Sequence, residues 1–231
     1  MPLKRLIQPV ASKLLAFQRS DTKFVWILAA LFLLILLNPV LSSVEFTNYF
    51  TNILLTLVVV SGILAASDER QVIRQLIFIG SITLSLDWIA SLSPGDRPIL
   101  SILVLGLYSI FMAIVTVAII LAIVQHKIVT LNTICGAISG YLMIGLTGAI
   151  LGSLLEVAHP GMFLSGGEPL AQDDLLSAML YYSLVTLSTI GYGDITPGLP
   201  LARSLSLALG LSGQIYLTVL VAMLVGKLLK D

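Results

Sequence analysis

The sequence predicts an all-α integral membrane protein with six membrane-spanning helices and one shorter helix that enters the bilayer and returns. Three observations lead to this fold class. Hydrophobic residues make up 58% of the chain and charged residues only 10%, whereas soluble domains carry about 25% charged residues. Six apolar runs are long enough for spanning helices, which need about 20 residues. A shorter apolar run, followed by a glycine-rich turn, lies between the last two.

The first 23 residues are basic and precede the first apolar run. Lys4, Arg5, Lys13 and Arg19 alternate with apolar side chains at roughly helical spacing. Such a pattern is typical of a helix that lies on a membrane surface. We therefore interpret residues 1–23 as a basic amphipathic cytoplasmic segment, with an unstructured basic tail as an equal alternative.

Four apolar runs follow and form a predicted four-helix unit, residues 24–125. The expected helices cover residues 24–41, 46–66, 72–92 and 99–124. The third is the most polar, with Arg74, Asp87 and several hydroxyl residues, so it should face protein rather than lipid. Asp87 precedes Trp88, a residue type common at membrane–water interfaces, which favours a position for Asp87 near the outer interface.

The fifth and sixth runs, residues 128–155 and 201–225, belong to a second predicted unit, residues 126–231. The fifth contains two G-x-x-x-G spacings, Gly136/Gly140 and Gly148/Gly152. Small residues one turn apart let helix backbones approach closely in lipid. The spacing therefore predicts tight packing along this helix.

Six spans place both termini on the same side of the membrane. Most lysines and arginines fall on that side, and this bias predicts that both termini are cytoplasmic. We expect a plasma membrane location. The opposite face should then be acidic and should attract cations; its acids are Glu45, Asp96, Glu156, Glu168, Asp173, Asp174 and Asp194.

The segment between the last two spans has an unusual order. A polar loop, residues 156–172, leads to Asp173 and Asp174, which suit a helix N-terminus, and then to the short apolar run 175–187. The return path, residues 188–197, reads STIGYGDITP. Non-helical backbone inside a bilayer must line protein or a water-filled cavity, so an ion can be the partner of its carbonyl groups.

Glycines at alternate positions favour this arrangement of carbonyl groups. Carbonyls of an extended strand alternate in direction, and pointing them the same way requires positive φ angles between them. Gly191 and Gly193 can adopt such angles at little cost. Thr189 adds a hydroxyl group at the inner end, and Tyr192 is expected to pack against the short helix.

The hexapeptide TIGYGD, residues 189–194, resembles the selectivity filter of potassium channels. The resemblance covers residues 128–229 and includes the preceding helix with its tyrosines. It implies an outer helix, a pore helix, a filter and an inner helix, assembled as a homotetramer around a central pore. It also implies that K⁺ is bound by carbonyl groups in the filter. The implied filter residues are Thr189, Ile190, Gly191, Tyr192 and Gly193, with carbonyl ligands from the first four and a hydroxyl from Thr189; the implied filter supports are Asp194, Tyr181 and Tyr182.

The inner helix offers candidates for a gate. Gly213 stands where the family has a hinge glycine, and close packing against the pore helix explains it equally well. Leu217, Val221 and Val225 follow about one turn apart and are candidate pore-lining residues. The fourth helix carries no lysine or arginine, so conventional voltage sensing, which requires charges that move through the field, is not expected.

These features predict a channel that conducts K⁺ passively and performs no enzymatic reaction. Apart from K⁺ itself no cofactor is expected. The expected partners are copies of the same chain, membrane lipid and a separate regulatory subunit, but not nucleic acid, because the net charge is zero. The alternatives are a weakly selective cation channel, a modulatory pore subunit or, less favoured, a potassium transporter.

Overall fold

The computed structural model describes residues 22–41, 47–66, 70–92, 97–125, 129–171 and 174–228. Almost all of the predicted basic segment, residues 1–23, lies outside these ranges, as do Glu45, Asp96 and Asp173. The elements in chain order are α2 (Lys23–Leu41), α3 (Thr47–Ala66), α4 (Arg70–Leu92), α5 (Pro98–Gln125), α6 (Leu131–Ala158), β1 (Phe163–Ser165), β2 (Glu168–Pro169), α7 (Leu175–Leu187), β3 (Ile195–Pro197) and α8 (Pro200–Leu228).

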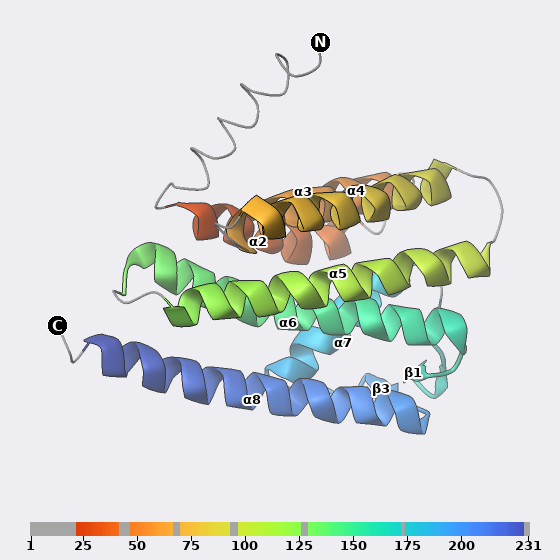
Figure 1. The fold of residues 1–231 in the computed structure, drawn as a ribbon. Helices are drawn as coiled ribbons and strands as arrows, with labels where there is room; N and C mark the ends of the chain where they lie inside the picture. The colour runs from red at the N-terminus through yellow and green to blue at the C-terminus, as the bar shows by residue number, and fades with distance from the viewer. Residues whose placement is uncertain are drawn as a thin grey trace, which may run out of the picture.

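Six of the described helices are long and apolar enough to cross a membrane, as the sequence predicts: α2, α3, α4, α5, α6 and α8. The long helices run side by side (Figure 1). Helix α2 begins and α8 ends at one end of the bundle, and the loop with β1 and β3 lies at the other end. We call this second end the filter end.

The helices pack in a continuous body. Helix α2 contacts α3 and α6, while α5 contacts α3, α4 and α6. Helix α7 lies against both α6 and α8. One cluster of buried apolar side chains, which extends from Phe24 in α2 to Ala202 in α8, joins these helices.

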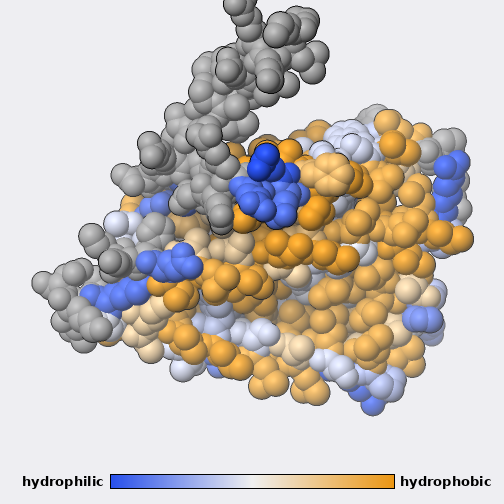
Figure 2. Space-filling view, in the orientation of Figure 1, coloured by the Kyte–Doolittle hydropathy of each residue, from blue (hydrophilic) through white to orange (hydrophobic). Residues whose placement is uncertain are grey.

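The outer surface of the bundle is apolar. Hydrophobic residues cover most of the face shown in Figure 2. Large side chains such as Phe78, Ile99 and Leu207 are exposed. A soluble monomer rarely exposes so much apolar surface, whereas a bilayer solvates it.

The glycines of α6 leave room for side chains of the neighbouring helices α7 and α8. Gly145 lies against Leu184 of α7, and a Cβ on Gly148 would collide with Leu209 of α8. The Ser183 hydroxyl in α7 donates a hydrogen bond to the Gly145 carbonyl at 2.6 Å. The close packing that the glycine spacing predicts is thus present.

A small sheet at the filter end departs from the all-α prediction. Its strand order is β2-β1-β3, and Leu164 pairs with Thr196 and with Pro169. The polar loop between the last two spans therefore contains two strands, and the third follows the filter sequence.

Glu156 holds this loop in place. The sequence predicts that Glu156 belongs to an acidic outer surface, but its side chain is not exposed. Its side chain is fully buried. The two carboxylate oxygens accept hydrogen bonds from the backbone N–H groups of Gly161 and Phe163, each at 2.8 Å. Charge-assisted bonds of this kind compensate the burial of a carboxylate.

Candidate ion-conducting site

The chain turns back sharply at the end of α7. Ser188 caps the helix, and its N–H donates to the Leu184 carbonyl. The next residues continue this pattern, since Ile190 N–H and Gly191 N–H both donate to the Val185 carbonyl, at 3.0 and 3.3 Å. The start of TIGYGD is therefore fixed to the last turn of α7. At the other end of α7, Asp174 occupies the N-cap position, but contrary to expectation its side chain makes no capping hydrogen bond.

Positive φ angles alternate along the filter sequence. Gly191 has φ +57° and Gly193 φ +80°, as the sequence predicts. Neither glycine has another atom within 4 Å of where a Cβ would be, so the dihedral angle rather than local space favours glycine. Thr189 also has a positive φ, +60°, which the sequence pattern does not predict. This conformation is rare for a β-branched residue, and strain of this kind costs about 1–3 kcal/mol.

The filter residues lie on the surface of the single protomer. All five residues from Thr189 to Gly193 are exposed. Tyr192 is 71% exposed, so its ring is not buried against α7 of the same protomer, whereas the sequence predicts packing against this helix.

Asp194 and Tyr181 lie together, as the resemblance implies. The Tyr181 hydroxyl donates to Asp194 Oδ2 at 2.7 Å. This bond, together with backbone N–H groups, lowers the pKa of the Asp194 carboxyl from its usual value. The bond joins the middle of α7 to the residue that follows the filter glycines.

The side chain of Tyr182, unlike that of Tyr181, is buried. Its hydroxyl lies 2.5 Å from Ser206 Oγ in α8, and its ring packs edge-on against Phe163 of β1 at 5.1 Å. Tyr182 thus connects α7 with α8 and with the small sheet. Ser206 was not singled out in the sequence, because a serine in an apolar helix usually bonds to its own backbone, as Ser206 also does.

Gly213 lies directly beneath the C-terminus of α7. A Cβ at this position would collide with the carbonyl oxygen of Leu187. Close packing therefore accounts for the glycine without a hinge. The neighbouring Gly210 is less constrained, since its Cβ would lie 4.0 Å from the Thr186 carbonyl oxygen.

A glutamine in α8 reaches the inner end of the filter sequence. Gln214 Nε2 lies 3.5 Å from the Thr189 hydroxyl oxygen, and Thr218 Oγ1 donates to the Gln214 carbonyl. The sequence contained a signal for this residue, because an amide in the middle of an apolar helix is costly in lipid and faces protein or water. Leu217 and Val225, two of the pore-lining candidates, are exposed on the protomer, and the side chain of Val221 lies outside the described part.

Comparison with known proteins gives the class of this domain. Residues 128–230 match the family described as Ion channel. This match covers α6, α7, the filter sequence and α8, so this part of the chain is similar to ion channel domains.

A relative supports the more specific resemblance. The two pore potassium channel c of Oryza sativa subsp. japonica is 37% identical over 79 residues, which cover 34% of this chain and 17% of the rice protein. The resemblance to the potassium channel family is confirmed by these two matches, although the chain matches only a small part of that relative's length. No solved structure shows a significant match to the chain.

Proposed function

We propose that this chain is the subunit of a potassium-selective channel that conducts K⁺ passively. The observation that carries the proposal is the alternation of positive φ angles at Thr189, Gly191 and Gly193. In an extended segment this alternation brings successive carbonyl groups to one side, where the oxygens of Thr189, Ile190, Gly191 and Tyr192 can replace the hydration shell of K⁺.

We further propose that four copies surround one pore. An exposed, non-helical segment is not tolerated against lipid, because its backbone groups need partners. Four symmetric copies would place the exposed filter segments around a common axis and cover the Tyr192 rings. The exposed apolar face of α8, with Leu207, Leu211 and Ile215, is then available for contacts between subunits.

In this assembly Tyr181, Tyr182 and Asp194 support the filter. The Tyr181–Asp194 bond fixes the outer end of the filter sequence, and Gln214 lies beside its inner end. The pore-lining face of α8 would then begin at Gln214 and include Leu217 and Val225.

We place both termini in the cytoplasm and the filter end outside a plasma membrane. The first residues of α2 and the last of α8 lie at the same end (Figure 1), and lysine and arginine are concentrated there in the sequence. Helix α5 contains no basic residue, so the open probability should vary only weakly with voltage.

Flux through reconstituted vesicles tests the proposal. The purified chain in potassium-loaded vesicles should produce a K⁺ flux that is much larger than the Na⁺ flux and that Ba²⁺ blocks. Equal fluxes of the two ions would identify a weakly selective cation channel. The absence of any flux from a correctly assembled tetramer would favour a modulatory subunit.

A further inference from the structure

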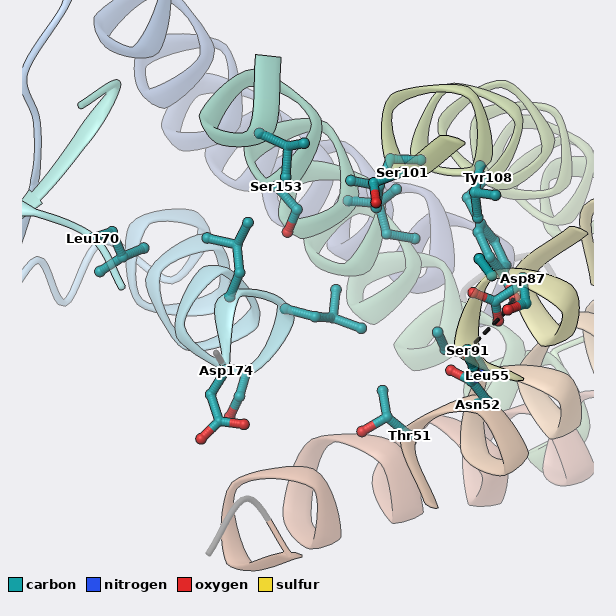
Figure 3. Close-up of a pocket in the computed structure, with 18 of the residues that line it drawn as sticks. Thr51, Asn52, Leu55, Asp87, Ser91, Ser101, Tyr108, Ser153, Leu170 and Asp174 are labelled. Atoms are coloured by element: carbon teal, nitrogen blue, oxygen red, sulfur yellow. Dashed lines mark hydrogen bonds between the residues drawn. The ribbon is translucent and has the colours of Figure 1, made fainter. Parts of the chain in front are cut away.

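A large cavity opens at the filter end, between the first four helices and the start of α7. Its volume is about 960 Å³, at the upper end of the range of about 300–1,000 Å³ typical of sites for small organic ligands. Six helices contribute to its lining, among them α3 through Asn52, α6 through Ser153 and α7 through Ser177. Figure 3 shows the side chains that point into it.

The polar part of the cavity is centred on Asp87. The Tyr108 hydroxyl donates to Asp87 Oδ2 at 3.0 Å. Beside it, Asn52 Nδ2 donates to Ser91 Oγ at 2.6 Å, and Ser91 Oγ donates to the Asp87 backbone carbonyl. Figure 3 shows these four residues on one side of the cavity. Tyr108 of α5 therefore binds the Asp87 carboxylate directly, while Asn52 of α3 binds the neighbouring Ser91.

Asp87 lies inside a helix long and apolar enough to span a membrane, which is an unusual place for an acidic side chain. It lies five residues before the last residue of α4, Leu92, which places it about 8 Å below the end of the helix. The sequence indicates an acid near the membrane interface beside Trp88; Asp87 lies near the filter end of α4, and its carboxylate accepts a hydrogen bond from Tyr108. Ionisable residues at such a depth usually pair with a charge or mark a binding site.

The cavity favours a cation and has room for more than an ion. Among the described residues that line it, the charged side chains are Asp87 and Asp174, both acidic. They lie on opposite sides of the cavity (Figure 3). The rest of the lining combines apolar side chains such as Leu55, Leu105 and Ile150 with the hydroxyl groups of several serines and a threonine. A bare metal ion would leave most of this volume unfilled.

We propose that this cavity binds an organic ammonium ion with an apolar group, and that Asp87 is its charged anchor. The ammonium group would lie among Asp87, Asn52 and Ser91, and the apolar group would lie along the walls formed by α5 and α6. Such a ligand would also contact Leu175 and Leu176, in the first turn of the helix that leads to the filter. The site is separate from the proposed path of K⁺, so it goes beyond the proposed function.

Binding of octylammonium to the purified full chain in maltoside micelles tests this site. Calorimetry should show saturable binding, and Asp87→Asn should weaken it by about tenfold or more, the scale of one hydrogen bond to a charged group. Octanol, which has the same chain without the charge, should bind at least tenfold more weakly. Glu168→Gln is the matched control, because it removes an acid at the same end outside the cavity, and it should leave binding unchanged.

A second variant keeps the test valid if Asp87→Asn does not fold. Ser101→Phe should fill the cavity and weaken octylammonium binding while Asp87 remains. Equal affinity for octanol and octylammonium would overturn the proposal, and so would binding that neither Asp87→Asn nor Ser101→Phe weakens. The assay requires no ion flux, so its outcome is independent of whether the chain conducts K⁺.

Addition of phosphatidylethanolamine identifies the source of the ammonium group. Competition with octylammonium that Asp87→Asn abolishes would assign the site to the headgroup of this lipid. Undiminished octylammonium binding in the presence of the lipid would assign the site to a free amine. Both results support an ammonium site at Asp87.

Discussion

The two halves of the chain are held together in different ways. From α6 to α8, hydrogen bonds join separate segments: Glu156 binds the following loop, Tyr181 binds Asp194, and Tyr216 donates to the Ala137 carbonyl at 2.6 Å. From α2 to α5, most serine and threonine hydroxyls donate to their own helix, as Thr56, Ser61 and Thr83 do.

This difference indicates that the two halves of the chain need different precision in the positions of their atoms. Apolar contacts between helices allow small shifts, whereas the position of a backbone carbonyl must be fixed within a fraction of an ångström to replace water around an ion. The bonded network surrounds the filter sequence, where the proposed coordination of K⁺ would require such precision. The main exception in the first half is the group at Asp87, Tyr108, Asn52 and Ser91, which is the place where we propose a second binding site.

The largest expected effect comes from Gly191→Ala. The added Cβ meets no neighbour, but the φ of +57° costs a non-glycine residue about 1–2 kcal/mol. In each of four subunits this cost shifts the filter backbone, so the K⁺ flux should fall by at least about a hundredfold. Measurement of the K⁺ flux through reconstituted vesicles checks this prediction.

Gly106→Ala in α5 is the matched control for Gly191→Ala. Its Cβ would also meet nothing within 4 Å, and its φ is not in the left-handed region. Alanine is the better helix former by up to about 1 kcal/mol, so flux and assembly should be unchanged. A loss of flux in Gly106→Ala equal to that in Gly191→Ala would contradict the contrast between the two halves.

The next effect is that of Gly213→Ala, which separates packing from bending. A Cβ here would meet the Leu187 backbone, and overpacking of this kind costs about 1–3 kcal/mol. We expect a lower melting temperature and a less stable form of the proposed tetramer, visible by size-exclusion chromatography after heating. Gly210→Ala, one turn earlier, should leave both unchanged. A normally stable Gly213→Ala tetramer with altered opening would instead identify a hinge.

The sequence predicted the helices and the filter sequence because both depend on local patterns. The apolar runs define the bounds of the spanning helices to within a few residues. The positive φ angles at Gly191 and Gly193 could be predicted because glycine adopts such angles readily. The small sheet was missed because its strands are three residues or fewer and the loop that contains two of them is held by a buried carboxylate, that of Glu156 in the last turn of α6. Burial of Glu156 cannot be inferred from a loop sequence that is rich in polar residues.

Other parts of the site depend on tertiary contacts that no local pattern contains. The positive φ of Thr189 runs against the preference of a β-branched residue, so propensity predicts the opposite. The exposure of Tyr192 differs from expectation because a single protomer does not contain all of the contacts of the ring in the proposed assembly. The cavity at Asp87 requires six helix ends to meet, although the acid itself was visible in the sequence.

Glu156→Gln should have an intermediate effect. An amide retains one acceptor oxygen but loses the charge, so one of the two bonds to Gly161 and Phe163 is lost or weakened. Loss of a buried hydrogen bond to a charged group costs about 1.5–3 kcal/mol. The melting temperature of the purified protein should fall by several degrees, while Glu168→Gln, on the exposed strand β2, should not change it. Equal melting temperatures for both variants would mean that Glu156 does not hold the loop.

The smallest expected effect concerns the pH at which Asp194 protonates. Its hydrogen bond from Tyr181 lowers the pKa below the usual 3.8, so the stabilisation is complete above that value and is lost as the pH falls through the lowered pKa. Tyr181→Phe removes the largest cause of the shift, and Asp194 should then protonate at a higher pH. Current recorded at decreasing external pH, normalised for each protein to its own value near pH 7, should therefore decline at a higher pH in Tyr181→Phe than in the wild type. Tyr182→Phe, which loses a bond to α8 rather than to Asp194, should keep the wild-type midpoint, and a shift in that variant alone would assign the acid sensitivity to the contact between α7 and α8.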